Sequence, residues 1–177
     1  VPMSKREGEY VKFRDVLDEV GVDATRFFYL MRTMESHLDF DLDLAKSKSQ
    51  ENPVYYVQYA HARICSIVDY ARRQLPWWKR LGPVDLALLA EPEERMVLRQ
   101  LFQFPMVTRA CAQALEPHGL TGYLQRLAEL LHVFYTKHRV VTEDAPRSRA
   151  RLALIQATRQ VLANGLGLLG VSAPRRM

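Results

Sequence analysis

Tyrosine and arginine side chains recur along one flank of the stretch from Asn52 to Arg73. They lie three, four and seven positions apart, which places them on one side of a helix: Tyr56, Tyr59, Arg63 and Tyr70. Flat rings beside a guanidinium group suit unpaired RNA bases, because each base offers a face for stacking and a nearby phosphate. Aromatic residues on a helix are also ordinary packing material, so these rings could instead fill the contact with a neighbouring helix.

A second group of aromatic and basic residues ends a later helical pattern. An apolar stripe running from Leu120 to Phe134 is followed at once by Tyr135, Lys137, His138 and Arg139. Tyr135 is therefore a second candidate for stacking on a base. A cationic last turn is also expected from the helix dipole alone, so the basic residues have a purely structural interpretation as well.

The composition indicates a globular protein with a basic surface. The chain has 177 residues, 48% of them hydrophobic and 25% charged, which excludes a disordered or fibrous protein. Its 25 basic and 20 acidic residues give a net charge of +5, which favours a polyanionic partner. No apolar run is long enough to cross a bilayer, and the N-terminus lacks the apolar core of a signal peptide. We therefore expect a cytoplasmic protein with no membrane partner.

The cysteine and histidine residues do not form a metal-binding pattern. Cys65 and Cys111 each lie inside an apolar helical pattern, without a second cysteine or a histidine at ligand spacing. The five histidines lack a spacing such as HExxH. We predict two small buried thiols and no metal site.

Capping residues and prolines divide the chain into helices, so we predict an all-α bundle. A long helix should begin at Asn52-Pro53, and a short one should cover residues 84–90. Further starts lie at Glu91-Pro92, Glu116-Pro117 and Asp144-Ala145-Pro146. Pro105 should separate two helices or kink one. About five main helices result.

The remaining segments give less regular signals. Tyr10 to Phe13 alternates like a short strand, residues 15–20 form a helix stopped by Gly21, and Asp23 caps the next helix. Residues 36–48 fit an extended entry followed by a short helix. Trp77 and Trp78 could anchor a loop or stack on a nucleotide. Arg159 interrupts an apolar stripe, so a carboxylate or an incoming phosphate should meet it.

Three stretches together resemble the C-terminal part of an arginyl-tRNA synthetase, a class I aminoacyl-tRNA synthetase. They are MSKREG with the following LDEVGVDATRFFYLMR, the block from HLDFDLDLA to NPVYYVQYAHARICSI, and the closing RLALIQATRQVLANGLGLLGVSAPRRM. The resemblance covers essentially the whole chain. It implies that residues 1–48 hold the end of the catalytic core, a KMSKS-like loop and a stem-contact segment, and that residues 49–177 form a helical DALR anticodon-binding domain.

The resemblance also implies a role in ATP chemistry for the first residues. Met3, Ser4, Lys5 and Arg6 stand where class I enzymes have their KMSKS loop, with Lys5 as the catalytic residue. A mobile ammonium group on a flexible loop can follow the charge that builds on pyrophosphate. Pro2 and Arg6 depart from that motif. The full-length enzyme would use arginine, ATP and magnesium, whereas this chain lacks the upstream catalytic domain and should be inactive alone and monomeric.

For the helical domain, the resemblance implies that Tyr59, Tyr135 and Met177 grip the anticodon loop of the arginine tRNA. Arg63 and Arg139 would neutralise phosphates beside the stacked bases; that assignment rests on their positions near the tyrosines. The alternative is a non-catalytic RNA-binding or protein-docking module derived from a synthetase.

Overall fold

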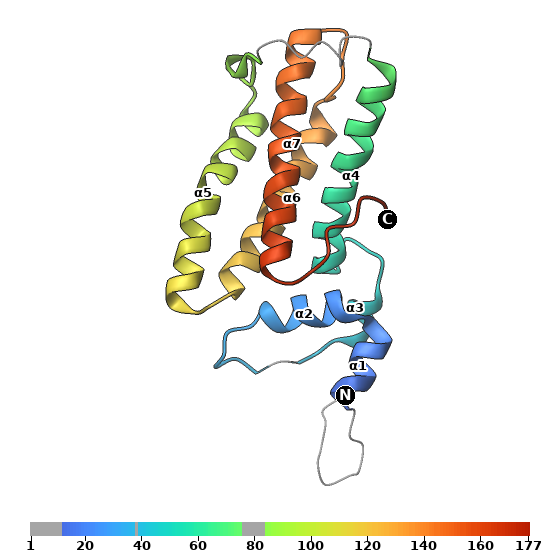
Figure 1. Cartoon of the computed structure of the whole chain (residues 1–177), viewed down its shortest axis with the longest axis vertical. Helices are drawn as coiled ribbons and strands as arrows, with labels where there is room; N and C mark the ends of the chain where they lie inside the picture. The colour runs from blue at the N-terminus through green and yellow to red at the C-terminus, as the bar shows by residue number, and fades with distance from the viewer. Residues whose placement is uncertain (1–11, 38, 76–83) are drawn as a thin grey trace.

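The computed structural model describes residues 12–37, 39–75 and 84–177, and every regular element in these ranges is a helix. Four long helices form a bundle: α4 (Pro53–Gln74), α5 (Pro92–Ala114), α6 (His118–Lys137) and α7 (Ala145–Leu168). Three shorter ones lie across the end of the bundle where α4 begins (Figure 1): α1 (Phe13–Val20), α2 (Val22–Leu30) and α3 (Leu42–Lys46). A 3₁₀ turn, η2 (Leu86–Leu88), precedes α5. The all-α prediction is confirmed.

The start of α4 joins the short helices to the bundle. The Asn52 side chain accepts a hydrogen bond from the Tyr55 N–H at 3.3 Å, and Pro53 is the first helical residue, as predicted. The amide nitrogen of the same side chain donates to the carbonyls of Ala45 and Ser47, at 3.1 and 2.8 Å. Because Asn52 is only 3% exposed, these bonds are shielded from water and fix the direction in which α4 leaves α3.

Several local predictions were wrong. Of the two alternatives for Pro105, the separation of two helices is excluded because Pro105 lies inside a continuous α5. The described part of the chain therefore has four long helices and not about five. Phe13 begins α1 instead of ending a strand, and Tyr10 and Val11 lie outside the described residues. Asp23 is the second residue of α2, not its cap. Its carboxylate instead accepts hydrogen bonds from distant residues, which a sequence pattern cannot reveal.

The core of the bundle lies where α4, α6 and α7 meet. The apolar stripe predicted for α6 is buried, and it belongs to the same core as the buried residues of α4 and α7. The most deeply buried side chains include Leu124, Leu127, Leu131 and Phe134 of α6, Ile155, Leu162 and Leu166 of α7, and Val57 and Ile64 of α4. Burial of this apolar surface drives the assembly. Among the described helices, α5 packs on α6 and α7 alone, so its other side faces away from the bundle.

The C-terminal segment turns back along α4 (Figure 1). Gly170 makes the turn with φ +66°, and the Val171 N–H donates to the Leu166 carbonyl at 2.9 Å. A Cβ atom on residue 170 would lie 2.3 Å from a guanidinium nitrogen of Arg26, so only glycine fits there unless the Arg26 side chain moves. The turn therefore sends residues 171–177 towards α4.

Polar contacts hold this segment in place. The Gln58 amide donates to the Asp23 carboxylate and to the Ser172 carbonyl, at 2.8 and 3.0 Å, and the Ser172 N–H donates to Asp23 at 3.1 Å. Further along, Nδ1 of His61 donates to the Pro174 carbonyl at 2.8 Å. The C-terminal segment is thus fastened to both α2 and α4.

Candidate nucleic-acid interface

A groove of about 390 Å³ lies between α4 and the end of α6. It is lined by Arg63, Ser66, Ile67, Tyr70, Tyr135, His138, Arg139, Val140 and Val141. The guanidinium carbon of Arg63 lies 5.9 Å from the centre of the Tyr135 ring, which is cation–π geometry. Three of the predicted RNA-contact residues, Arg63, Tyr135 and Arg139, therefore meet in one groove although they belong to different segments.

Tyr135 is held in a fixed orientation at the groove. Its hydroxyl shares a hydrogen bond of 2.8 Å with Nδ1 of His132, and the two ring centres are 5.0 Å apart. Burial, followed by the proximity of Tyr59 and Tyr56, raises the pKa of Tyr135 to about 12. The phenol is therefore neutral at physiological pH and does not repel a phosphate.

Tyr59 lies close to the groove but does not line it. Its half-buried ring stacks on Tyr55, with centres 6.3 Å apart and planes inclined by 16°. Tyr59 lies four residues before Arg63 on α4, so the two side chains are on the same side of that helix. Some rings of the tyrosine flank thus pack on other rings, whereas Tyr70, with 52% of its surface exposed, lines the groove.

Met177 lies at the end of the C-terminal segment with 54% of its surface exposed, and it is not among the residues that line the groove. Arg175 is 3.7 Å from the Asp69 carboxylate of α4, so the segment runs along α4 to within two residues of Met177. The structure thus groups Arg63, Tyr135 and Arg139, has Tyr59 beside them, and leaves Met177 outside the groove lining. The predicted loop residues Met3, Ser4, Lys5 and Arg6 lie outside the described residues.

The two groove arginines carry charge that no carboxylate neutralises. Arg63 and Arg139 are exposed, and neither forms an ion pair with an acid in the part of the chain that the structure describes. An exposed guanidinium group beside an aromatic ring can donate hydrogen bonds to a phosphate without first giving up an ion pair within the protein. The groove is therefore suited to an anionic ligand with flat rings.

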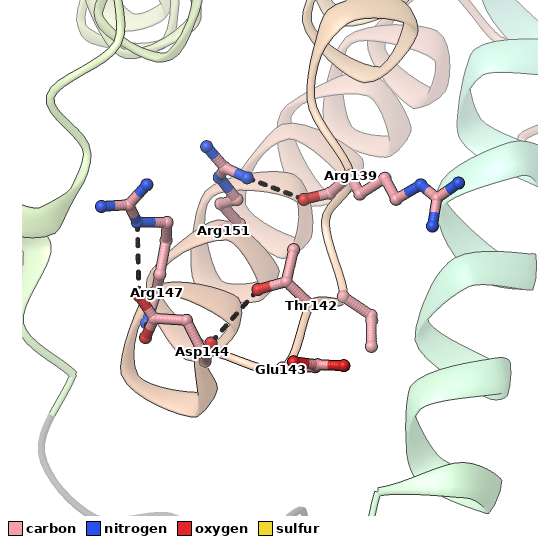
Figure 2. Close-up of a pocket in the computed structure, with 7 residues that line it drawn as sticks. Arg139, Thr142, Glu143, Asp144, Arg147 and Arg151 are labelled. Carbon is pink, nitrogen blue, oxygen red and sulfur yellow. Dashed lines mark hydrogen bonds and ion pairs between the residues drawn. The ribbon is translucent and has the colours of Figure 1, made fainter.

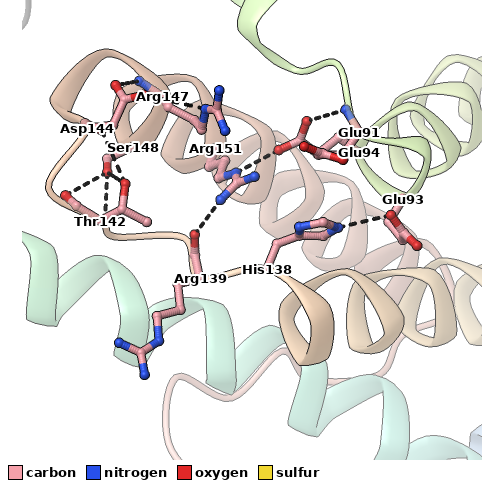
Figure 3. Close-up of polar contacts among 10 residues, drawn as sticks. All are labelled: Glu91, Glu93, Glu94, His138, Arg139, Thr142, Asp144, Arg147, Ser148 and Arg151. Atoms are coloured by element: carbon pink, nitrogen blue, oxygen red, sulfur yellow. Dashed lines mark hydrogen bonds and ion pairs between the residues drawn. The ribbon is translucent and has the colours of Figure 1, made fainter.

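Residues of α5 help to hold the backbone at Arg139, which lines the groove (Figure 3). Glu94, fully buried, accepts a hydrogen bond from Nε of Arg151 at 2.6 Å. The same arginine donates from Nη1 to the backbone carbonyl of Arg139 at 2.8 Å. Because Arg139 lies two residues after the end of α6, this bond holds the backbone from which the Arg139 side chain enters the groove.

A neighbouring acid holds the end of α6. Glu93 contacts Nζ of Lys137 at 2.5 Å and Nε2 of His138 at 2.9 Å. These hydrogen bonds, that from Lys137 first, lower the pKa of Glu93 to about 2. Glu93 therefore stays ionised through the physiological range and pins the two residues that precede Arg139.

A second cavity, of about 620 Å³, lies on the other side of the α6–α7 connection. Figure 2 shows that the Arg139 side chain points away from this cavity and towards α4. The Arg147 and Arg151 side chains lie on the cavity side of the connection. Glu143 and Asp144 also line it, and Asp144 caps α7 by accepting from the Arg147 N–H at 3.0 Å. Its mixed charge gives no clear preference for a ligand.

Sequence reasoning missed several parts of this site. Arg159 has no carboxylate partner in the described ranges, and the buried arginine that needs one is Arg151. His132 carried no signal of its own, although its spacing of three from Tyr135 makes contact possible on a helix. Glu94 lies in the first turn of α5, where the helix dipole alone would favour an acid, and its partner Arg151 is 57 residues away in the sequence.

Both cysteines lie among the described residues. Cys65 is buried and Cys111 is partly buried, and both are free thiols. Within residues 12–37, 39–75 and 84–177, no group of three or more acidic, histidine or cysteine side chains is placed to hold a metal ion. In the same ranges, none of the helices combines the length and the apolar character that a membrane crossing requires.

Comparison with known proteins gives consistent matches. The arginine–tRNA ligase of Symbiobacterium thermophilum is 55% identical over 175 residues, which are 99% of this chain and 31% of that protein. The ligase of Carboxydothermus hydrogenoformans is 51% identical over the whole chain, which is 32% of its length. The chain thus spans about a third of the relatives it matches.

Structure and family comparisons agree with these relatives. The Thermus thermophilus arginyl-tRNA synthetase superimposes with a TM-score of 0.75 and 30% identity, covering 98% of this chain and 29% of that one. The family described as the DALR anticodon binding domain matches residues 57–177, which include all four bundle helices apart from the first turn of α4. The groove lies within this match, and the chain belongs to the DALR anticodon-binding domain family.

Proposed function

We propose that this chain is the tRNA-binding C-terminal part of an arginine–tRNA ligase and that its groove receives the anticodon stem-loop of the arginine tRNA. The observation that carries the proposal is the meeting of Arg63, Tyr135 and Arg139 in one groove within the matched domain. Unpaired bases stack on aromatic rings, and guanidinium groups bind the phosphates that join them. The relatives named arginine–tRNA ligase support the choice of tRNA as partner.

Within the groove, the residues have separate tasks. Tyr135 offers a ring to one base, while Arg63 and Arg139 neutralise the phosphates on either side. Tyr59 and Met177, which do not line the groove, would contact other parts of the anticodon loop. His132 orients Tyr135 through their hydrogen bond of 2.8 Å.

Replacement of Tyr135 tests this proposal. Stacking on an aromatic ring is worth about 1 to 3 kcal/mol per base, so Tyr135→Ala should weaken binding of an arginine tRNA roughly ten- to a hundredfold. Tyr135→Phe keeps the ring and should retain most of the affinity. Binding is measured by filter titration of the purified chain with tRNA transcripts, including transcripts altered only at the anticodon.

An exposed apolar residue outside the groove serves as the control. Leu168 at the end of α7 is 61% exposed and does not line the groove, so Leu168→Ala should leave the affinity unchanged. Equal affinity of Tyr135→Ala and the unsubstituted chain would remove Tyr135 from the interface. Equal affinity for transcripts with altered anticodons would contradict anticodon recognition.

We further propose that residues 1–48 continue the catalytic core, and that residues 49–177 form the anticodon-binding domain. In the whole ligase, Met3, Ser4, Lys5 and Arg6 would form the loop that closes on ATP, with magnesium balancing the phosphate charge. Arginine and ATP would bind in the part of the ligase that this chain does not contain. We expect the protein to be a cytoplasmic monomer.

A further inference from the structure

The outer face of α5 carries an unusual combination of exposed side chains. Successive members lie four, three, four, three and four residues apart, which forms one straight stripe on a helix. The stripe consists of Arg95, Arg99, Phe102, Met106, Arg109 and Gln113, all exposed. Phe102 is 80% exposed and Met106 is 71% exposed. Solvent-facing apolar side chains of this size, side by side on one helix, indicate a contact surface.

The stripe does not take part in the bundle. Val97 is buried and Leu101 and Phe104 are partly buried on the opposite side of α5, where the helix meets α6 and α7. No other described helix packs on α5, and its outer side faces solvent at the edge of the molecule (Figure 1). Packing of the described residues therefore does not explain Phe102 or Met106.

The charge of this face is entirely positive. The sequence from Arg95 to Leu115 contains three arginines and neither aspartate nor glutamate. Arg95, Arg99 and Arg109 form no ion pair within the described ranges. The stripe is thus a row of uncompensated guanidinium groups around two apolar side chains.

Several exposed arginines on other helices have a carboxylate partner. Arg14 of α1 pairs with Asp18 at 3.4 Å, and Arg126 of α6 pairs with Glu129 at 2.6 Å. Arg147 of α7 lies 3.5 Å from Asp144. Each of these has an ion-pair partner three or four residues away. Arg99 and Arg109 have no acid at that spacing, and Arg95 forms no ion pair with Glu91, four residues before it. The positive face of α5 therefore follows from the local sequence of this helix.

We propose that the α5 stripe is a second RNA-binding surface, which holds the sugar-phosphate backbone of the same tRNA outside the anticodon loop; this rests on the proposed function. Arg95 and Arg109 are separated by about 21 Å along the helix, since each residue adds about 1.5 Å. Guanidinium groups spread over that length match a strand of phosphates, each of which carries a negative charge. Phe102 and Met106 cover a sugar or an exposed base between them.

Charge complementarity favours RNA over the other occupants of such a face. A second copy of this chain would bring the arginines of two stripes together, which like-charge repulsion opposes. A protein partner would need an acidic strip matched to widely spaced arginines, whereas a phosphate backbone supplies that charge along any sequence.

The salt dependence of tRNA binding tests the proposal. The logarithm of the affinity falls with the logarithm of the salt concentration, by about 0.7 to 0.9 for each phosphate contact. The triple variant Arg95→Gln, Arg99→Gln and Arg109→Gln should therefore reduce this slope by about 2 to 3. Glutamine is a good helix former at an exposed position, so the fold is retained.

A matched triple variant distinguishes the loss of phosphate contacts from the loss of total positive charge. Arg14→Gln, Arg126→Gln and Arg147→Gln removes the same charge from exposed sites that already have a carboxylate neighbour. This control should change the slope by less than 1, because no phosphate contact is lost. Equal slopes for the two triple variants would overturn the proposal.

Failure of the proposed function gives a different result. If the unsubstituted chain binds no tRNA at any salt concentration, both proposals fail together. If it binds, and Tyr135→Ala weakens binding while the α5 triple variant keeps the original slope, only the α5 proposal fails. That second result is also the one expected if an acidic protein occupies the face.

Discussion

Breaking the ion pair between Glu94 and Arg151 should destabilise the domain more than any exposed charge substitution. The two side chains are 0% and 6% exposed, and their charged atoms are 2.6 Å apart. Removing one member leaves the other charge buried without its counter-ion, which typically costs about 3 to 5 kcal/mol. For a domain of this size that corresponds to a loss of roughly 6 to 20 °C in melting temperature.

The variants Glu94→Gln and Arg151→Met test this by urea denaturation followed by circular dichroism. Arg151→Met should be the more severe, because it also removes the donor to the Arg139 carbonyl, worth about 0.5 to 1.5 kcal/mol. The control is Arg147→Met on the same helix. Its ion pair with Asp144 is about half exposed, so its loss should cost less than about 1 kcal/mol.

A double-mutant cycle with Glu94→Leu and Arg151→Met completes the test. Two apolar side chains leave no buried charge, so the double variant should be more stable than the sum of the single losses predicts. If each single variant loses less than about 1 kcal/mol, or if the two losses add, then the pair is not the buried, coupled unit described above.

Two further predictions concern Glu93 and the ATP-loop residue Lys5. Because the pKa of Glu93 is lowered from 4.5 to about 2, its stabilising contribution is complete above pH 4.5 and is lost as the pH falls towards 2. The Glu93→Gln variant should therefore lose less stability than the unsubstituted chain between pH 4.5 and pH 2, as measured by melting temperatures from pH 6 to pH 2. The same dependence of melting temperature on pH in both proteins would contradict the contacts with Lys137 and His138. In the whole ligase, Lys5→Ala should slow adenylate formation by at least tenfold without changing tRNA affinity, and a pyrophosphate-exchange rate equal to that of the unsubstituted enzyme would exclude the role of Lys5.

Features with a local cause could be predicted from the sequence. Asn52-Pro53 marks the start of α4 because cap and preset φ act within one turn, and Asp144 marks the start of α7 in the same way. Pro105 shows where local rules fail. It removes one backbone donor from α5, but Leu101 and Phe104 before it and Val107 and Cys111 after it pack against the core, and this tertiary contact outweighs the local cost.

The site was predictable only in part for the same reason. The spacing of Tyr59 and Arg63 on α4 follows from helical periodicity, so their shared flank could be anticipated. The approach of Tyr135 to Arg63 depends on how α6 crosses α4, which no single-segment pattern contains. Likewise, Glu94 and Arg151 are 57 residues apart, and only the packing of α5 on α7 brings them together.

The contact among Asp23, Gln58 and Ser172 also bears on the order of folding. Asp23 and Ser172 are separated by 149 positions, so closing that loop early would cost much chain entropy. The contact can form at low cost only after α7 has docked and Gly170 has turned the chain back. We therefore expect α2 to acquire its final orientation on α4 late, once the four long helices have assembled.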